Sequence, residues 1–253
     1  MRRLSCLVAL LPAALLAQYP RTTVELRASM DALSGGRASW QEHTATLGAR
    51  TSARTGVSVG AAWLERFAQV DRQLVADGSI AAGRRVTLGA DLMWSPTAAV
   101  VARSGGGVRA NLSLGKGWGV EGRAAVRSYA ASNVRLASGT LERYWGSWSG
   151  SYTASVSALE NAPRGITHGA RLSRFWQERG IVTVGVSSGR EVEALGAGLV
   201  LPMTVRSGGM WGAIPLGAHL DLTFAAGVTQ QDDFFTRRHA ALGLRVVRGR
   251  SPM

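Results

Sequence analysis

The chain has 253 residues, with 29 Lys and Arg against 16 Asp and Glu, so its formal net charge is +13. That length is enough for one large all-β domain. A single cysteine, Cys6, excludes an internal disulfide framework and a metal site built from several thiolates.

Residues 1–17 have the features of an export signal. Arg2 and Arg3 give a positive start, Leu4–Leu16 is apolar, and Ala17 supplies a small residue for cleavage before Gln18. A membrane anchor is the alternative, but the apolar stretch is shorter than the roughly 20 residues that a spanning helix needs. We therefore predict a signal peptide over residues 1–17 and a mature domain over residues 18–253. Cleavage leaves 27 basic residues against the same 16 acids, a formal charge of +11.

The positive charge alone does not identify a partner. A basic chain can bind nucleic acid or another polyanion, but Lys116 is the only lysine, and an arginine bias is as easily explained by codon usage. An exported chain also rarely meets nucleic acid. We expect no nucleic-acid partner.

Alternation with a period of two dominates the mature sequence. In Thr23–Met30, for example, apolar Val24, Leu26, Ala28 and Met30 alternate with polar or charged residues, as the two faces of a β-strand do. The same pattern occurs in five further segments: Arg85–Leu92, Val108–Leu114, Ser147–Ser157, Leu216–Phe224 and Ala240–Val246.

Three features favour a membrane barrel over a soluble sandwich. The alternating segments run about ten residues, the length of a tilted transmembrane strand. The polar face is rich in Gly, Ser, Thr and Arg, which suits a wet interior. The tryptophans also lie near the expected strand ends, as in the aromatic girdles at the two membrane interfaces; they are Trp40, Trp63, Trp94, Trp118, Trp145, Trp148, Trp176 and Trp211.

Connection lengths support an up-and-down barrel. Short turns are expected near 51–55, 83–84, 115–117, 146 and 178–180, and longer connections at 31–39, 95–105, 159–166 and 230–235. Short turns belong on the periplasmic side and long loops outside. We predict an all-β, transmembrane, antiparallel up-and-down β-barrel of 12–14 strands, with 14 favoured.

Several motifs at strand ends resemble a known group. They are Leu33-Ser34-Gly35-Gly36-Arg37 followed by Trp40, the Arg66-Phe67 to Asp71 segment, Trp94-Ser95-Pro96, Gly117-Trp118, Tyr129 through Asn133-Val134, and Tyr144 before Trp148. In this order they resemble the YaiO family of outer-membrane β-barrels. The resemblance implies an outer-membrane location, a single barrel domain and, for some members, a link to exopolysaccharide loci. Outer-membrane barrels usually end on an aromatic residue that the barrel-assembly machinery reads, whereas this chain ends Arg250-Ser251-Pro252-Met253.

Arginines on the polar faces are the main candidates for a functional site. By strand parity, seven should point into the lumen: Arg27, Arg85, Arg109, Arg123, Arg127, Arg171 and Arg245. They could form a structural ladder with inward acids such as Glu25, Asp91, Glu121 and Asp221, or an anion-selective lining. A third possibility is contact between lipopolysaccharide phosphates and the rim arginines Arg37 and Arg103.

No pattern for catalysis or metal binding stands out. The four histidines lack HExxH-type spacing, and no serine lies in a nucleophile elbow. Ser104–Gly107 is glycine-rich but precedes a strand, so we expect a flexible external loop and no phosphate cradle. We expect no enzyme activity, no metal and no cofactor. The leading hypothesis is a channel for small anionic or saccharide solutes, and the alternative is a structural or interaction barrel with a plugged lumen. Expected partners are outer-membrane lipid, lipopolysaccharide and the barrel-assembly machinery, and the oligomeric state stays open.

Overall fold

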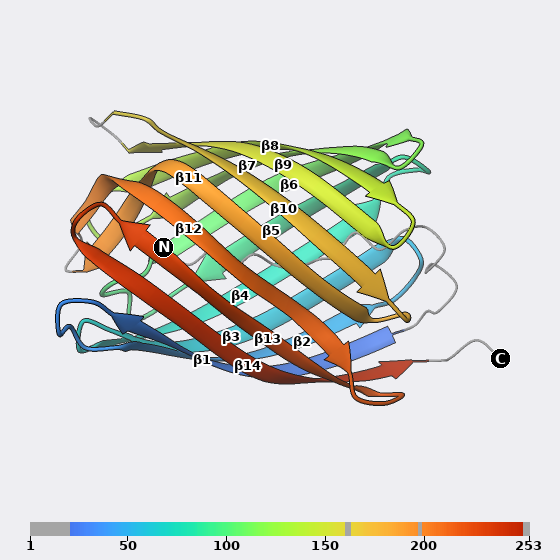
Figure 1. Ribbon diagram of the computed structural model, residues 1–253, viewed down its shortest axis with the longest axis horizontal. Helices are drawn as coiled ribbons and strands as arrows, with labels where there is room; N and C mark the ends of the chain where they lie inside the picture. Colours follow the sequence, from blue (N-terminus) through green and yellow to red (C-terminus); the bar gives the residue numbers. More distant parts are fainter. Residues whose placement is uncertain (1–20, 160–162, 197–198, 250–253) are drawn as a thin grey trace.

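The computed structural model describes residues 21–159, 163–196 and 199–249 of the chain. The predicted signal peptide and the residues at the extreme C-terminus lie outside this described part. The described residues form fourteen antiparallel strands (Figure 1): β1 Arg21–Leu33, β2 Trp40–Arg50, β3 Thr55–Arg66, β4 Gln69–Ala81, β5 Val86–Trp94, β6 Ser104–Gly115, β7 Trp118–Ser128, β8 Asn133–Trp145, β9 Trp148–Leu159, β10 Gly165–Trp176, β11 Gly180–Gly196, β12 Leu199–Pro215, β13 Leu220–Gln231 and β14 Phe235–Gly249.

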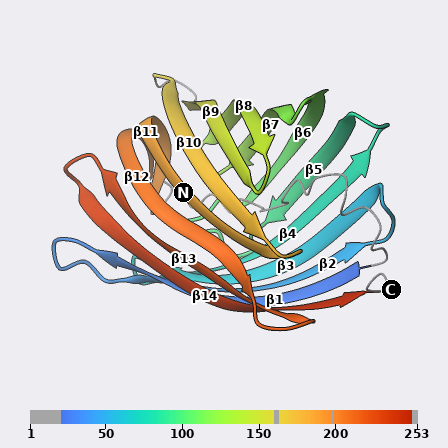
Figure 2. The ribbon, with the colours of Figure 1, turned by 45° about the vertical axis from the view of Figure 1, so that its right-hand side comes forward.

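The strands close into a barrel. Each pairs with its sequence neighbour, and β1 also pairs with β14 from Arg21 opposite Gly249 to Leu33 opposite Arg237. Closure leaves no strand edge with unpaired backbone groups, as a sheet surrounded by lipid requires. The strands run obliquely around the barrel in both ribbon views (Figures 1 and 2). The prediction of an all-β barrel with fourteen strands is confirmed.

The barrel carries its apolar side chains on the outside. In β1, Leu26 is 61% exposed, whereas Asp31 on the opposite face is 1% exposed. The region from Ser132 to Trp145, where the sequence alternates poorly, forms the regular strand β8, and its burial alternates along the whole strand. Polar residues therefore line the interior and apolar residues face outward, the arrangement of a membrane barrel.

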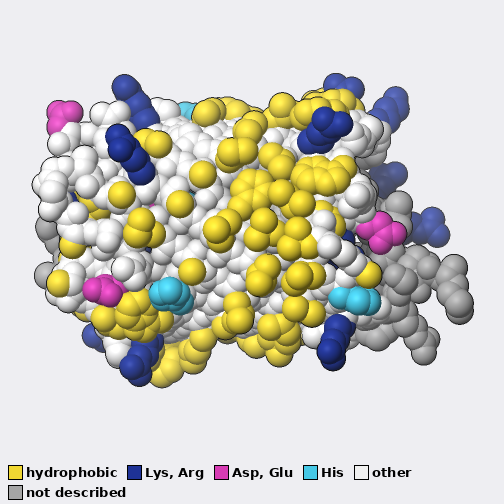
Figure 3. All heavy atoms as spheres, turned by 60° about the horizontal axis from the view of Figure 1, so that its bottom comes forward, with side chains coloured by type: hydrophobic (Ala, Val, Ile, Leu, Met, Phe, Trp, Pro, Cys, Tyr) yellow, Lys and Arg dark blue, Asp and Glu magenta, His cyan; other side chains and the backbone are white. Residues whose placement is uncertain are grey.

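Hydrophobic side chains gather over the middle of the outer wall. In Figure 3, which brings the bottom of Figure 1 forward, Lys and Arg side chains lie near the two ends of this face. The order is the one expected for a wall that crosses a bilayer. Among the described residues, no helix is long and apolar enough to cross a membrane.

The two ends of the barrel differ in their connections. β1 begins and β14 ends at one end, which we call the terminal end; the connections there are short, as at Lys116, where Gly115 and Gly117 both have positive φ. A Cβ on Gly117 would overlap the carbonyl of Tyr144, so the turn needs glycine there. The opposite end, which we call the loop end, carries longer connections, including residues 34–39 and 95–103.

One connection differs from the sequence prediction. Ser104–Gly107, expected to be a flexible external loop, forms the start of β6 and pairs with β5 and β7. Glycine is favourable here because a Cβ on Gly107 would lie only 2.9 Å from Oδ1 of Asp91. The missing side chain makes room for a neighbour's carboxylate, so a glycine run that seemed flexible belongs to the wall.

Candidate functional site

Two acid–arginine pairs line the inner wall over β4 to β7. Asp77 and Asp91 are direct cross-strand partners on β4 and β5. Arg109 and Arg123 are direct partners on β6 and β7. Both terminal nitrogens of Arg109 donate to Asp77, at 2.6 and 2.9 Å, and Arg123 donates to Asp91 at 2.8 Å. Each arginine reaches across one strand, so two unfavourable like-charge neighbours are converted into two ion pairs.

Glycine makes this reach possible. Gly89 on β5 is the cross-strand partner of Arg109, and a Cβ there would lie 2.7 Å from the guanidinium carbon. The side chain of Arg109 therefore passes over Gly89 on its way to β4. The buried position of the pair follows: the side chain of Arg109 is 12% exposed and that of Asp77 is 7% exposed.

A second charge cluster lies at the terminal end. Asp221 is fully buried, and Oδ2 accepts hydrogen bonds from Nε and a terminal nitrogen of Arg245 at 3.0 and 2.9 Å. Its other oxygen accepts a bond of 2.8 Å from Nε of Arg179, which lies in the turn between β10 and β11. Nearby, Thr223 donates to Glu25 at 2.9 Å. A buried carboxylate held by two guanidinium groups is a structural cross-link.

Arg171 differs from these arginines. It lies on the inward face of β10 but is exposed, and it makes no ion pair with the residues that the structure describes. Glu142 on β8 acts on it electrostatically. The ring of Trp211 lies beside Arg171, and both side chains lie over Gly185. A Cβ on Gly185 would lie 2.8 Å from that ring and 3.0 Å from Cγ of Arg171. The lumen therefore presents an open cation next to an aromatic ring.

The remaining predicted arginines divide into two groups. Arg27 and Arg127 lie on inward faces of β1 and β7, and Arg127 contacts the sulfur of Met93. Arg85 lies outside the strands: β5 begins only at Val86, and Arg85 is an exposed residue of the preceding turn. Strand parity does not apply there, because a turn side chain is not bound to either face of the sheet.

Six of the eight tryptophans lie on the outward face near a strand end, where an interface aromatic must lie. Trp63 and Trp94 are at the loop end, and the other four, at the terminal end, are Trp118, Trp145, Trp148 and Trp176. Arg143 lies over the ring of Trp118 at 5.1 Å, and Arg174 lies over Trp148 at 5.4 Å.

Two tryptophans lie inside the barrel, contrary to the expectation of an interface position. Trp40 is 3% exposed and packs edge-on against Phe67 and Phe235, with ring centroids 5.0 and 5.6 Å apart. Arg66 lies over its ring at 5.2 Å. Trp211 shares its inward face with buried Ala213. Proximity to a strand end does not determine which face of the sheet a ring occupies. Both rings lie on the inward face because their positions in the alternation of β2 and β12 are inward.

The connection between β5 and β6 is held inside the mouth at the loop end. Asp71 on β4 is 2% exposed and accepts hydrogen bonds from the backbone N–H groups of Ala99, Val100 and Val101 at 2.7, 2.8 and 2.9 Å. Ala102 belongs to a buried cluster that includes residues of β8, β11 and β12. No pattern in the sequence indicates this role of Asp71, although Asp71 ends one of the motifs that carry the resemblance.

Sequence reasoning also missed Asp77 and Arg179. Asp77 lies between Ala76 and Gly78, two small residues that do not mark an apolar face, so its parity was not visible. Arg179 lies in a turn, and nothing in its local sequence indicates a partner 42 residues away. Among the described residues, no group of three or more His, Cys, Asp and Glu is arranged to hold a metal ion.

Comparisons with known proteins place the fold. No protein-family model matches the chain, and no curated protein matches it. Among solved structures it is similar to the CymD monoaromatic hydrocarbon channel, with a TM-score of 0.60, 10% identity, and coverage of 96% of this chain and 92% of that one. It is also similar to a bacterial polysaccharide outer membrane secretin, with a TM-score of 0.56, 9% identity, and coverage of 91% of this chain and 98% of that one. A third similar structure is the outer membrane protein Omp33 of Acinetobacter baumannii, with a TM-score of 0.53, 9% identity, and coverage of 90% of this chain and 98% of that one. The chain has the fold of outer-membrane β-barrel proteins.

Proposed function

We propose that this protein is a channel of the bacterial outer membrane that passes small anionic solutes. The observation that carries the proposal is Arg171, an inward-facing and exposed guanidinium with no ion-pair partner among the described residues. In a lumen of reduced dielectric, one such charge attracts anions more strongly than it would in bulk water. The similarity to solved channels supports the fold that this role needs.

Several of the arginines that strand parity places in the lumen are held in ion pairs. Arg109, Arg123 and Arg245 are each bound to a carboxylate, so they contribute little net field and act as the structural ladder. Selectivity in the proposal therefore depends on Arg171, with the adjacent ring of Trp211 offering an apolar face. A ring and a cation side by side suit an anionic saccharide, whose carbon face packs on aromatics.

Further parts of the proposal rest on the sequence. The signal peptide predicted over residues 1–17 and the outer-membrane fold support export and insertion by the barrel-assembly machinery. The order of the strand-end motifs supports membership of the YaiO family and, with it, a link to exopolysaccharide export. The longer connections at the loop end support an extracellular position for that end.

Reversal potential across a KCl gradient in a planar bilayer tests the channel. We expect an anion preference that falls in Arg171→Gln, because that substitution removes the open lumen charge without breaking an ion pair. Arg135→Gln is the matched control, since Arg135 lies on the outward face of β8 and should leave the potential unchanged. The same reversal potential in Arg171→Gln and wild type would contradict the proposed role of Arg171.

The second candidate is a barrel with a plugged lumen. The observation in its favour is the β5–β6 connection, whose Val100 and Ala102 are 4% and 3% exposed and which Asp71 holds in the mouth. This reading predicts no conductance in the wild type and its appearance in Asp71→Ala. The bilayer experiment separates the two candidates directly.

A further inference from the structure

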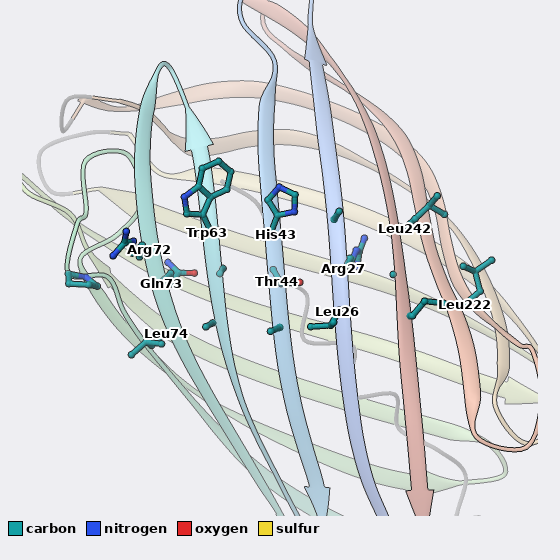
Figure 4. A pocket seen from close by; sticks show the side chains of 17 residues that line it. Leu26, Arg27, His43, Thr44, Trp63, Arg72, Gln73, Leu74, Leu222 and Leu242 are labelled. Atoms are coloured by element: carbon teal, nitrogen blue, oxygen red, sulfur yellow. The ribbon is translucent and has the colours of Figure 1, made fainter.

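The outer wall carries an open apolar hollow. It spans β13, β14, β1, β2, β3 and β4, with Pro96 of the β5–β6 connection at its edge. Its volume is about 1020 Å³, at the upper end of the range for small-molecule pockets, roughly 300–1,000 Å³. Figure 4 shows its side chains on neighbouring strands. The hollow faces outward, where the sheet presents its apolar side chains to lipid.

Alanines form the floor of the hollow. Ala45 and Ala61 are cross-strand partners, and they continue a row that has Leu26 on one side and Leu74 on the other. Leucines form the walls because their side chains rise above the short alanine side chains; Leu26 is 61% exposed and Leu74 51% exposed. The result is a trough in the wall that is wide enough for a chain of methylene groups and offers it apolar contacts.

The outward-pointing polar side chains of the lining lie along the edge nearest the loop end. The next row toward that end runs from Ala28 through His43 and Trp63 to Arg72, and Figure 4 shows the three larger side chains side by side on β2, β3 and β4. The rings of His43 and Trp63 lie 5.4 Å apart. Arg72 is exposed and makes no ion pair with any described residue.

Charge in the hollow has one sign. No Asp or Glu lines it, whereas Arg72 and His43 do on its outward side, and Arg27 does from the inward face of β1. A cation at the interface edge of an apolar trough complements a lipid that joins acyl chains to a phosphate. A hydrocarbon alone would leave Arg72 without a partner, and a second barrel copy would bring its own apolar wall with no anion.

We propose that this hollow is a binding site for a phosphorylated glycolipid of the lipid A type, with an acyl chain in the alanine trough and a phosphate on Arg72. We choose lipid A because Arg72 lies toward the loop end, which is the extracellular end in the proposed function. The inference rests on that proposed location. It assigns the site to the outer wall that runs from β13 and β14 through β1 to β4.

Native mass spectrometry of the full mature protein in detergent tests the site. The probe is diphosphorylated lipid A, and its dephosphorylated form and phosphatidylglycerol serve as comparisons. Ala45→Phe and Ala61→Phe fill the trough from positions that face lipid. Each should weaken lipid A binding about tenfold, because displacing two methylene groups costs roughly that factor. Arg72→Gln should abolish the preference for the diphosphorylated form and leave weaker binding.

Matched controls make the result specific. Ala110→Phe adds the same ring to an outward position of β6, and Arg135→Gln removes an outward arginine of β8; both should bind lipid A as the wild type does. Retained heat-modifiable migration shows that each variant is folded.

Several outcomes would overturn the inference. They are an equal loss in the controls, no loss in Ala45→Phe and Ala61→Phe, phosphatidylglycerol binding as tight as lipid A binding, or a dimer that the filled trough abolishes. Bilayer conductance of the same variants is independent of this result. A conducting wild type without site-dependent lipid binding rejects the lipid site alone, whereas a non-conducting wild type with such binding rejects the channel alone.

Discussion

Replacing Asp77 with Asn should destabilise the barrel far more than replacing Asp91 with Asn. Asp77 receives two hydrogen bonds from Arg109, and the two side chains are 7% and 12% exposed. Replacing Asp77 takes the carboxylate away from a buried guanidinium, and breaking a buried pair in this way costs about 3 kcal/mol or more. Asp91 receives one bond from Arg123, and these side chains are 14% and 34% exposed. Solvent screening limits that loss to about 1 kcal/mol or less.

The assay is urea unfolding of the barrel in lipid vesicles, with the free energy of unfolding taken from the midpoint and slope. The double variant Asp77→Asn/Arg109→Gln should be more stable than the sum of its two single variants predicts, since it leaves no unpaired charge. We expect a coupling energy of about 2 kcal/mol between the two positions. Equal losses for Asp77→Asn and Asp91→Asn, or a strictly additive double variant, would refute the assignment of the first pair as a structural cross-link.

Three further predictions test the two faces of β5, the β5–β6 connection and the space over Gly89. Leu88→Arg puts a charge on the outward face and should cost about 2–4 kcal/mol in a bilayer, whereas Thr87→Arg faces the lumen and should cost far less; similar losses in refolding titrations would mean that the parity of β5 is wrong. Asp71→Ala removes the acceptor of three backbone hydrogen bonds and should make the β5–β6 connection cleavable by protease, while unchanged protection would show that other contacts hold it. Gly89→Val should displace the guanidinium of Arg109 and lower the free energy of unfolding nearly as much as Asp77→Asn does. If the Gly89→Val variant were as stable as the wild type, the close passage of Arg109 over β5 would be contradicted.

The fold could be predicted because the membrane imposes a simple pattern. A strand between lipid and water must alternate apolar and polar side chains, so segments such as Thr23–Met30 and Val108–Leu114 reveal both their structure and their faces. Fourteen strands followed from counting these segments and the turns between them. Export of the chain is still a prediction, because residues 1–17 lie outside the described part.

The site could be predicted only in part, because parity gives a face and not a partner. Arg109 and Arg123 lie inward as expected, but their acids are set by inter-strand register and by the room over Gly89 and Gly107. Arg179 reaches Asp221 from a turn, where no period applies. Trp211 shows the converse failure, since a large ring near a strand end suggested an interface and the inward register overrides that.

Single-channel current through the wild-type protein in a planar bilayer tests the central claim most directly. The account predicts discrete conductance steps whose reversal potential in a KCl gradient indicates a preference for chloride, because Arg171 presents an exposed cation in the lumen that is not held in an ion pair with any described residue. Properly folded, inserted protein that gives no steps, or steps that prefer potassium, would contradict it.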